Sequence, residues 1–322
     1  MGLQGECWMP LVLAQAVAVA FVLLLSPLYR GVLERLRARA AFRVGPPILQ
    51  PYRDLRKWLH KETVRSQSAS WLAATAPLVY FLAPITVAIL IPVLTAFPLP
   101  LAFMGDMLGG GFILSGGGFW LLLAALDAGS PFSALGVSRI RLVGVFTEPL
   151  VVLAVFAAAA VGRATIPFVV NVQMGSLLWR WSPAHLLLLV AWFLFVVAET
   201  GRIPVDNPTS TQELSLIDPA RLFEASGTDL ALYEWGGWMK FMVLAIIGVN
   251  VIATPWGLAP AVTVAGLGLA ILATALKLLI FGVVMILFEV SFAKLRLLRI
   301  PEFLAASALV ALLAGVAALA LG

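Results

Sequence analysis

The sequence has little charge and almost no cysteine. Charged residues make up 11% of its 322 residues, whereas a typical soluble domain has roughly 25%. The mean hydropathy is +1.03. Together these values exclude a soluble enzyme, an intrinsically disordered protein and a nucleic-acid-binding protein. The single cysteine, Cys7, excludes a disulfide framework, a cysteine-ligated iron–sulfur cluster and a structural zinc site.

Histidine is equally scarce. The only two are His60 and His185, which argues against a b-type haem, and no spacing typical of metal ligands is present. The sequence also lacks a Ser/His/Asp triad and a P-loop, so we predict no catalytic residue. We therefore expect this chain to bind no metal and no cofactor of its own, and any redox cofactor to lie in another polypeptide.

Long apolar runs are what the sequence has instead. A membrane-spanning helix needs about 20 mostly apolar residues, and eight runs meet that need. We therefore predict an all-α integral membrane protein, with eight transmembrane helices in a single polytopic domain over residues 1–322. The expected spans are Trp8–Tyr29, Trp71–Phe97, Met107–Leu126, Leu142–Gly162, Trp181–Ala198, Trp235–Thr254, Pro260–Phe288 and Phe303–Leu321.

The basic residues predict an orientation for these spans. The sequence pI is about 9.7, but Lys and Arg lie between the apolar runs, which favours a membrane surface over nucleic acid as their partner. Eighteen lie in odd-numbered connections and only two, Arg163 and Arg180, in even-numbered ones. Because positive charge concentrates in cytoplasmic loops, the odd connections are expected in the cytoplasm and both termini in the periplasm.

The first cytoplasmic loop, residues 30–70, carries a turn and an amphipathic pattern. Gly45-Pro46-Pro47 is incompatible with a helix. After it, Leu55, Trp58 and Leu59 share one helical face while Arg53 and Lys57 lie on another. The pattern predicts a short helix on the bilayer. Such a helix serves either as a docking surface or as a basic anchor to anionic lipid, and the pattern leaves both open.

The second cytoplasmic loop, residues 199–234, is acidic. It holds seven of the 16 acidic residues, which is unusual on the positive side of a membrane protein. Pro204 and Pro208 break any helix. One interpretation is a segment that enters the protein at membrane depth, where irregular backbone occurs only beside protein or water. The other is a solvated acidic loop.

Three ionisable residues fall inside or at the end of the apolar runs. Glu148 interrupts the fourth, Lys277 lies in the middle of the seventh, and Glu289 follows the end of that run. Charge at membrane depth is costly, so such residues are candidates for function. Lys277 and Glu289 are 12 residues apart, about 18 Å along a helix, and are not expected to pair.

Four segments carry distinctive motifs: Phe42–Lys57, Asp127–Phe132, Ala198–Leu214 and Ala293–Glu302. The motifs in the two loops resemble the complex I subunit 1 family, which includes a membrane subunit of bacterial NADH:quinone oxidoreductase. The whole chain is similar, and some segments are closer to membrane subunits of formate hydrogenlyase, hydrogenase-4 and other group 4 [NiFe] hydrogenases. Two differences from the quinone-reactive branch also favour the hydrogenase side. The glycine-rich insertion of that branch is missing from the first loop, and Thr209 and Thr211 replace two of its glutamates.

The resemblance implies a membrane-anchoring, proton-conducting subunit of an energy-converting hydrogenase complex in the bacterial cytoplasmic (inner) membrane. Its expected partners are the [NiFe] large subunit and the iron–sulfur small subunit at the cytoplasmic face, besides antiporter-like membrane subunits. The expected docking residues are Arg43, Gln50, Arg53, Asp54, Lys57 and Arg202. The expected proton path comprises Glu199, Asp206, Glu213, Glu148, Glu289 and Lys277, since a buried carboxyl can bind and release a proton near neutral pH.

Two alternatives remain at the level of sequence. The first is the quinone-binding subunit of a proton-pumping NADH:quinone oxidoreductase. The second is a stand-alone cation/proton antiporter, against which the missing internal repeat and the docking motif argue. Within the acidic loop, Glu199 could pair with Arg202 and hold the loop instead of carrying protons.

Overall fold

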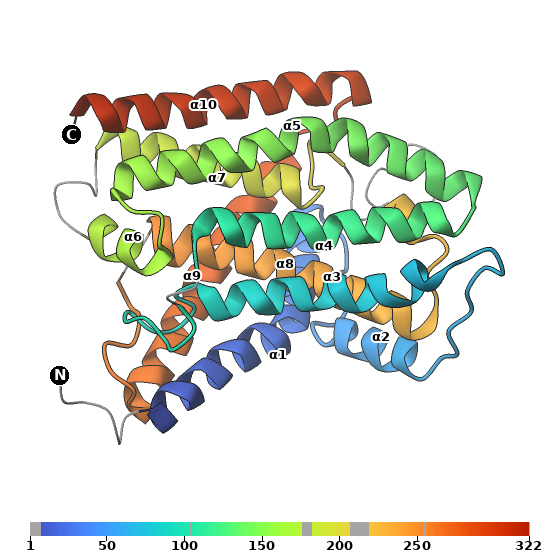
Figure 1. Ribbon diagram of the computed structural model, residues 1–322, viewed down its shortest axis with the longest axis horizontal. Coiled ribbons are helices and arrows are strands. Elements are labelled where there is room, and N and C mark those ends of the chain that lie inside the picture. Colours follow the sequence, from blue (N-terminus) through green and yellow to red (C-terminus); the bar gives the residue numbers. More distant parts are fainter. Residues whose placement is uncertain (1–7, 103–104, 176–181, 207–218, 254–255, 322) are drawn as a thin grey trace.

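A computed structural model describes residues 8–102, 105–175, 182–206, 219–253 and 256–321. Within these ranges the regular structure is helical, as predicted, and the chain is a multi-pass membrane protein (Figure 1). The helices are α1 (Trp8–Ala40), α2 (Gln50–Leu59), α3 (Trp71–Leu90), α4 (Met107–Asp127), α5 (Pro131–Gly162), α6 (Pro167–Met174), α7 (Pro183–Glu199), α8 (Gly227–Ile246), α9 (Val264–Ser291) and α10 (Ile300–Leu321), with the 3-10 turns η2 (Pro219–Leu222) and η4 (Leu297–Arg299) and the π-helix η3 (Ile247–Ala253).

Seven helices in the described part of the chain are long and apolar enough to cross a bilayer. They are α1, α3, α4, α5, α8 with η3, α9 and α10. The eighth expected span, Trp181–Ala198, corresponds to α7, an apolar helix of 17 residues. Because about 20 residues are needed for a full crossing, the count of eight spans stays a prediction.

Two helices extend beyond the membrane spans expected for them, because charge does not end a helix. α1 continues past Tyr29 to Ala40 and includes an i,i+4 ion pair between Arg30 and Glu34 at 2.6 Å. It stops shortly before the Gly45-Pro46-Pro47 turn. α5 begins at Pro131, so Arg139 lies within a helix and not in a connection.

The centre of the bundle is α8 with η3. Of the most apolar 18 residues in this stretch, 83% are buried inside the protein. The corresponding value is 28% for α9 and for α10. α8 packs on α3 and α1, and α5 and α7 both pack on α10. Polar side chains on α8 and η3 therefore face protein, whereas much of α9 and α10 faces outward.

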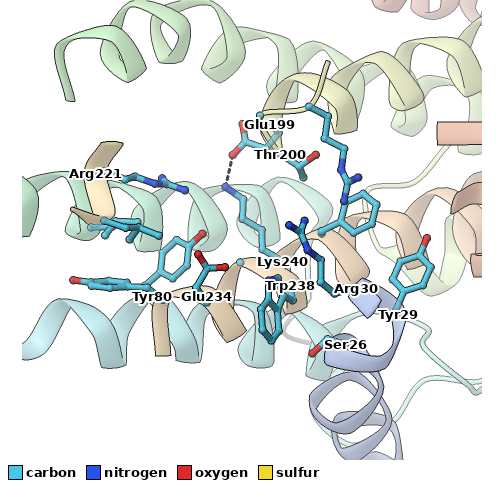
Figure 2. Close-up of a pocket in the computed structure, with 17 residues that line it drawn as sticks. Ser26, Tyr29, Arg30, Tyr80, Glu199, Thr200, Arg221, Glu234, Trp238 and Lys240 are labelled. Atoms are coloured by element: carbon cyan, nitrogen blue, oxygen red, sulfur yellow. Dashed lines mark hydrogen bonds and ion pairs between the residues drawn. The ribbon is translucent and has the colours of Figure 1, made fainter. Parts of the chain in front are cut away.

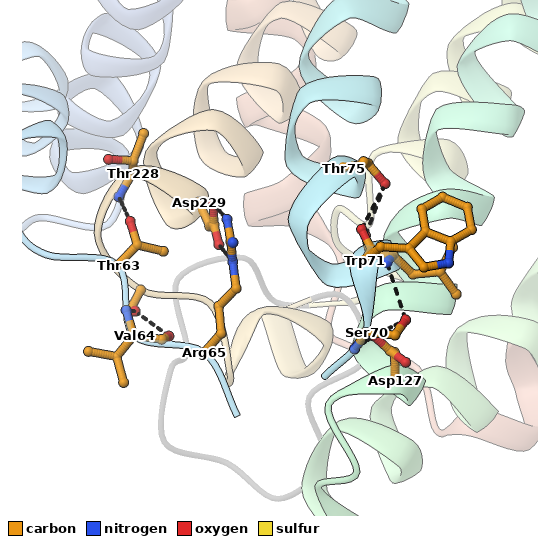
Figure 3. Close-up of polar contacts among 11 residues, drawn as sticks. Thr63, Val64, Arg65, Ser70, Trp71, Thr75, Asp127, Thr228 and Asp229 are labelled. Atoms are coloured by element: carbon orange, nitrogen blue, oxygen red, sulfur yellow. Dashed lines mark hydrogen bonds and ion pairs between the residues drawn. The ribbon is translucent and has the colours of Figure 1, made fainter. Parts of the chain in front are cut away.

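The first loop, predicted from the sequence to be cytoplasmic, is fastened to the start of α8 and to the end of α4 (Figure 3). Arg65 forms a two-point ion pair with Asp229, with N–O distances of 2.7 and 2.9 Å, and this contact raises the pKa of Arg65. The Asp127 carboxylate accepts from the Ser70 backbone N–H at 2.6 Å. Gly227 has a φ of +53°, and a Cβ there would lie 2.5 Å from the Glu62 carbonyl oxygen, so this close approach requires glycine.

The helices alternate in direction, so the two chain ends share one end of the molecule. The start of α1 and the end of α10 lie on the left in Figure 1, whereas α2 and the turn between α4 and α5 lie on the right. This arrangement fits termini on the same side of the membrane. The periplasmic location of that side remains a prediction from the basic residues.

Cysteine labelling tests this orientation. In a Cys7→Ser background, cysteines at Arg56, on α2, and at Thr165, between α5 and α6, should react with a membrane-impermeant thiol reagent from opposite sides, because both positions are exposed at opposite ends. When sealed inverted membrane vesicles are compared with right-side-out vesicles, Arg56→Cys should label only in the inverted ones. Labelling of both positions from outside would contradict this topology.

Candidate functional site

A polar cavity lies beside the end of α7, between α1, α3 and α8 (Figure 2). An ion pair lines this cavity. It joins Glu199 at the end of α7 to Lys240 on α8, with an Oε1–Nζ distance of 2.7 Å. Only 17% of the Glu199 side chain and 11% of the Lys240 side chain are exposed. Tyr80 and Arg221 line one side of the cavity, and Arg30 the other. The cavity therefore joins titratable groups from several separate elements.

A second cavity shares Glu199 and Lys240 with the first and extends toward α5. Glu148 on α5 lines it, as does Asp206 in the segment after α7. Glu148 is exposed as a residue, whereas Asp206 is buried, with 1% of its surface exposed. Three of the expected proton-path carboxylates thus border one connected polar region.

Asp206 is held by a lysine from the far end of the sequence. Its Oδ1 accepts from Lys294 Nζ at 2.8 Å, and the Pro204 carbonyl accepts from the Leu295 N–H at 2.8 Å. The segment after α7 therefore packs against the connection between α9 and α10. This interior position favours the interpretation of a segment that enters the protein over that of a solvated loop, for the residues up to Asp206.

Glu289 lies in a buried cluster of three charges. Its two oxygens pair with Arg37 at 2.5 Å and with Arg202 at 2.9 Å. The Arg202 guanidinium also lies over the Phe241 ring, 3.9 Å from its centre. Burial lowers the pKa of Arg202 to about 10, and the Glu289 carboxylate opposes this shift, so Arg202 remains charged at neutral pH.

These contacts correct one expectation for the acidic loop and decide against one alternative. Arg202 is buried, with 3% of its surface exposed, and lies in the interior instead of on a docking surface. It pairs with Glu289 and not with Glu199, which pairs with Lys240. The physical reason is that the chain turns sharply after α7, at Gly201 with a φ of +56°, which sends Arg202 back into the bundle. Glu213 lies outside the described residues.

Lys277 belongs to a different cluster. Its ammonium donates to Asn250 Oδ1 at 3.0 Å and to the Trp256 carbonyl at 2.5 Å. Asn250 lies on the π-helix η3, whose carbonyls accept further bonds from Asn171 and His185. As predicted, Lys277 does not pair with Glu289. Among the described residues, those that line the two cavities around Glu199 do not include Lys277.

The basic face of the first loop is exposed. α2 buries Pro51 and Leu55, and Trp58 packs against Trp238 of α8, so the helix rests on protein as well as facing outward. Its exposed cations include Arg53, Arg56 and Lys57 on α2 and Arg43 in the turn before it. Gln50 and Asp54 are half-buried and hydrogen-bond each other at 2.9 Å. The face thus offers fixed positive charge to a partner or to lipid.

The cationic partners of these acids are not apparent from the sequence. Lys240 is one of the eighteen basic residues counted in the odd-numbered connections, yet it lies inside α8 and is buried. Its position within the apolar run Trp235–Thr254 is the available signal, since a lone lysine there needs a partner. Arg37 and Lys294 give no such signal, because each lies near other basic residues.

The known proteins that this chain resembles all point to one family. The family model described as NADH dehydrogenase matches residues 12–320. Formate hydrogenlyase subunit 4 of Escherichia coli (strain K12) is 33% identical over 274 residues, covering 84% of this chain and 87% of that protein. Hydrogenase-4 component C of the same strain is 32% identical over 290 residues, covering 89% of each.

Two further similarities are more distant. A subunit of the NADH-quinone oxidoreductase of Rubrobacter xylanophilus is 28% identical over 223 residues, or 66% of this chain and 64% of that protein. A chain in the structure of the membrane-bound sulfane sulfur reductase (MBS), an archaeal respiratory membrane complex, matches with a TM-score of 0.80. That match covers 96% of this chain and 99% of the other at 19% identity, which establishes a shared fold.

Proposed function

Because this chain belongs to the NADH dehydrogenase (complex I subunit 1-like) family, we propose that it is the membrane subunit of a group 4 [NiFe] hydrogenase-like, energy-converting complex. The observation that carries the proposal is similarity along nearly the whole chain to formate hydrogenlyase subunit 4 and hydrogenase-4 component C. The similarity to the NADH-quinone oxidoreductase subunit is weaker and covers less of both chains. A quinone-binding role is therefore the second candidate.

In this proposal the chain anchors a hydrogenase large subunit and an iron–sulfur small subunit at the cytoplasmic face of the bacterial inner membrane. The exposed cations Arg43, Arg53 and Lys57 on the first loop form the docking surface. The geometry supports this role for α2. This helix packs on α8 through Trp58 and Trp238, so a module docked on α2 would be connected to the helix that carries Lys240.

The same geometry supports a proton path. Glu199, Asp206 and Glu148 border two adjoining cavities, and each cavity has more free volume for water than one molecule needs, at about 130 and 110 Å³ against roughly 10–15 Å³. Carboxylates joined by water can pass protons from the redox module into the membrane. Antiporter-like subunits would receive them, and Glu213 is placed on this path by sequence alone.

Purification with a tag on this chain tests the docking proposal. The wild-type chain should retain [NiFe] and iron–sulfur subunits, and the Arg53→Glu/Lys57→Glu double variant should lose them while remaining in the membrane, since α2 is not a span. Hydrogenase activity in the membrane fraction is the measurement. A stand-alone antiporter would purify alone.

The control is Arg296→Glu/Arg299→Glu, which reverses two exposed charges elsewhere, in the connection between α9 and α10. It should retain the hydrogenase. If the α2 variant also retains it, the first loop is only a lipid anchor. If NADH-oxidising subunits co-purify in place of hydrogenase, the second candidate replaces the first.

A further inference from the structure

A third cavity connects Glu199 with the opposite end of the molecule. It is enclosed by α3, α4, α5, α7 and the junction of α8 with η3. Glu199 lies in its wall at one end and Asp106, immediately before α4, at the other. Asp106 lies at the end of the bundle where α1 starts and α10 finishes (Figure 1). Glu199 lines this cavity and the two polar cavities already described.

The wall between the two carboxylates is almost entirely apolar. It includes Ile91, Val151 and Phe195, and carbon atoms make up most of the surface that lines the cavity. Ser115 on α4 borders this cavity and the one beside Glu148, so it marks the junction with the polar region. Asp106 and Ser115 are nine residues apart, about 14 Å along the helix. The cavity therefore covers a large part of the bilayer thickness.

Asp106 has an unusual environment for a carboxylate. Its Oδ1 atom is buried and accepts no hydrogen bond from any described residue, while the residue as a whole is partly exposed. A buried acceptor without a partner is costly. A proton or a water at that oxygen removes the cost, so the arrangement suits a group that exchanges protons between the cavity and the outer surface.

Two glycines keep the passage open. Gly110 and Gly111 line it from α4, and a Cβ on Gly111 would lie only 3.3 Å from Val151 Cγ2. Even so, the free volume for water is about 30 Å³, room for about two waters, which is too little to span 14 Å continuously. An apolar constriction of this kind conducts only when it wets. A route that stayed wet would leak protons back across the membrane.

We propose that this chain carries its own gated proton route across the membrane, from Glu199 through the apolar cavity to release at Asp106. This inference rests on the proposed function, because that function supplies protons at Glu199. The inference goes beyond the proposed function because it places a proton exit in this subunit and not only in antiporter-like partners. No bond other than the transferred O–H bond forms or breaks.

The test uses the complex purified with its partners and reconstituted in liposomes. Asp106→Asn keeps the size of the side chain but cannot carry a proton, and Gly111→Val fills the passage. Each should lower the number of protons released per electron pair while turnover with uncoupler stays at wild-type level. The double variant should show the same loss as each single one, because both block one route. Asp106→Glu should restore release.

Gly116→Val is the matched control, since it lies on the same helix and a Cβ there meets nothing within 4 Å. It should release protons as wild type does. If Gly111→Val fails to assemble, Asp106→Asn still decides. If Asp106→Asn releases protons normally while Glu199→Gln/Lys240→Met does not, the exit lies in a partner and this route is refuted, although the proposed function stands. Normal release in both would refute the proton-path part of the proposed function as well.

Discussion

Glu199→Gln should sharply reduce the amount of assembled subunit, whereas Glu199→Gln/Lys240→Met should restore assembly without restoring proton coupling. The reason is the 2.7 Å ion pair in the centre of the bundle. Removing one partner leaves an uncompensated buried charge, which costs about 3–5 kcal/mol, whereas replacing both with groups of similar volume is often neutral. Total stability is typically about 5–15 kcal/mol, so the single variant loses a large share of it.

Two measurements separate structure from proton transfer. Subunit content in the membrane reports assembly, and hydrogen evolution with proton uptake in the same vesicles reports coupling. Lys240→Met alone should assemble better than Glu199→Gln, because a carboxyl group can protonate when its partner is lost. Full coupling in the assembled double variant would exclude Glu199 from the proton path and leave it a structural role.

The apolar runs predict the helical membrane fold because hydropathy is a local property. Each run of about 20 apolar residues finds one physical solution, since every backbone polar group must be satisfied within the helix. Helix ends are less predictable. The charge that follows Tyr29 predicts the end of the first membrane span there, yet the helix continues to Ala40, since Arg and Glu are good helix formers.

The site is less accessible from sequence because its contacts join distant parts of the chain. Glu199 and Lys240 are 41 residues apart, and Arg37 and Glu289 are 252 apart. Proximity in sequence suggests that Glu199 pairs with Arg202, but the turn at Gly201 directs Arg202 toward α9. The acids themselves stand out in the sequence, because their cost at membrane depth is independent of the partner.

Asp106 shows the complementary limit. It lies in a connection between apolar runs, where an acidic residue is ordinary, so no pattern distinguishes it. Only the packing of α3, α4, α5 and α7 reveals that Asp106, with one buried oxygen, lines a cavity that also reaches Glu199. Enclosure of this kind depends on which helices are neighbours, and periodicity does not specify neighbours.

Glu289→Gln should be the most destabilising single change in the charged cluster that joins α1, α9 and the segment after α7. It would leave Arg37 and Arg202, whose side chains are 14% and 3% exposed, as two like charges without a counter-ion. Loss of such a partner costs about 3–5 kcal/mol, and the repulsion adds to it. Arg37→Met should cost less, because it leaves a neutral pair of Arg202 and Glu289.

Thermal unfolding of the detergent-solubilised complex, followed by tryptophan fluorescence, measures this order. The matched control is Glu34→Gln, which breaks the partly exposed i,i+4 pair with Arg30. That pair is worth only about 0.3–0.5 kcal/mol, so the Tm should barely change. The expected Tm is therefore lowest for Glu289→Gln, intermediate for Arg37→Met and highest for Glu34→Gln. Equal Tm values for Glu289→Gln and Glu34→Gln would mean that water reaches the two arginines, and the cluster would then belong to the hydrated path instead of the structural core.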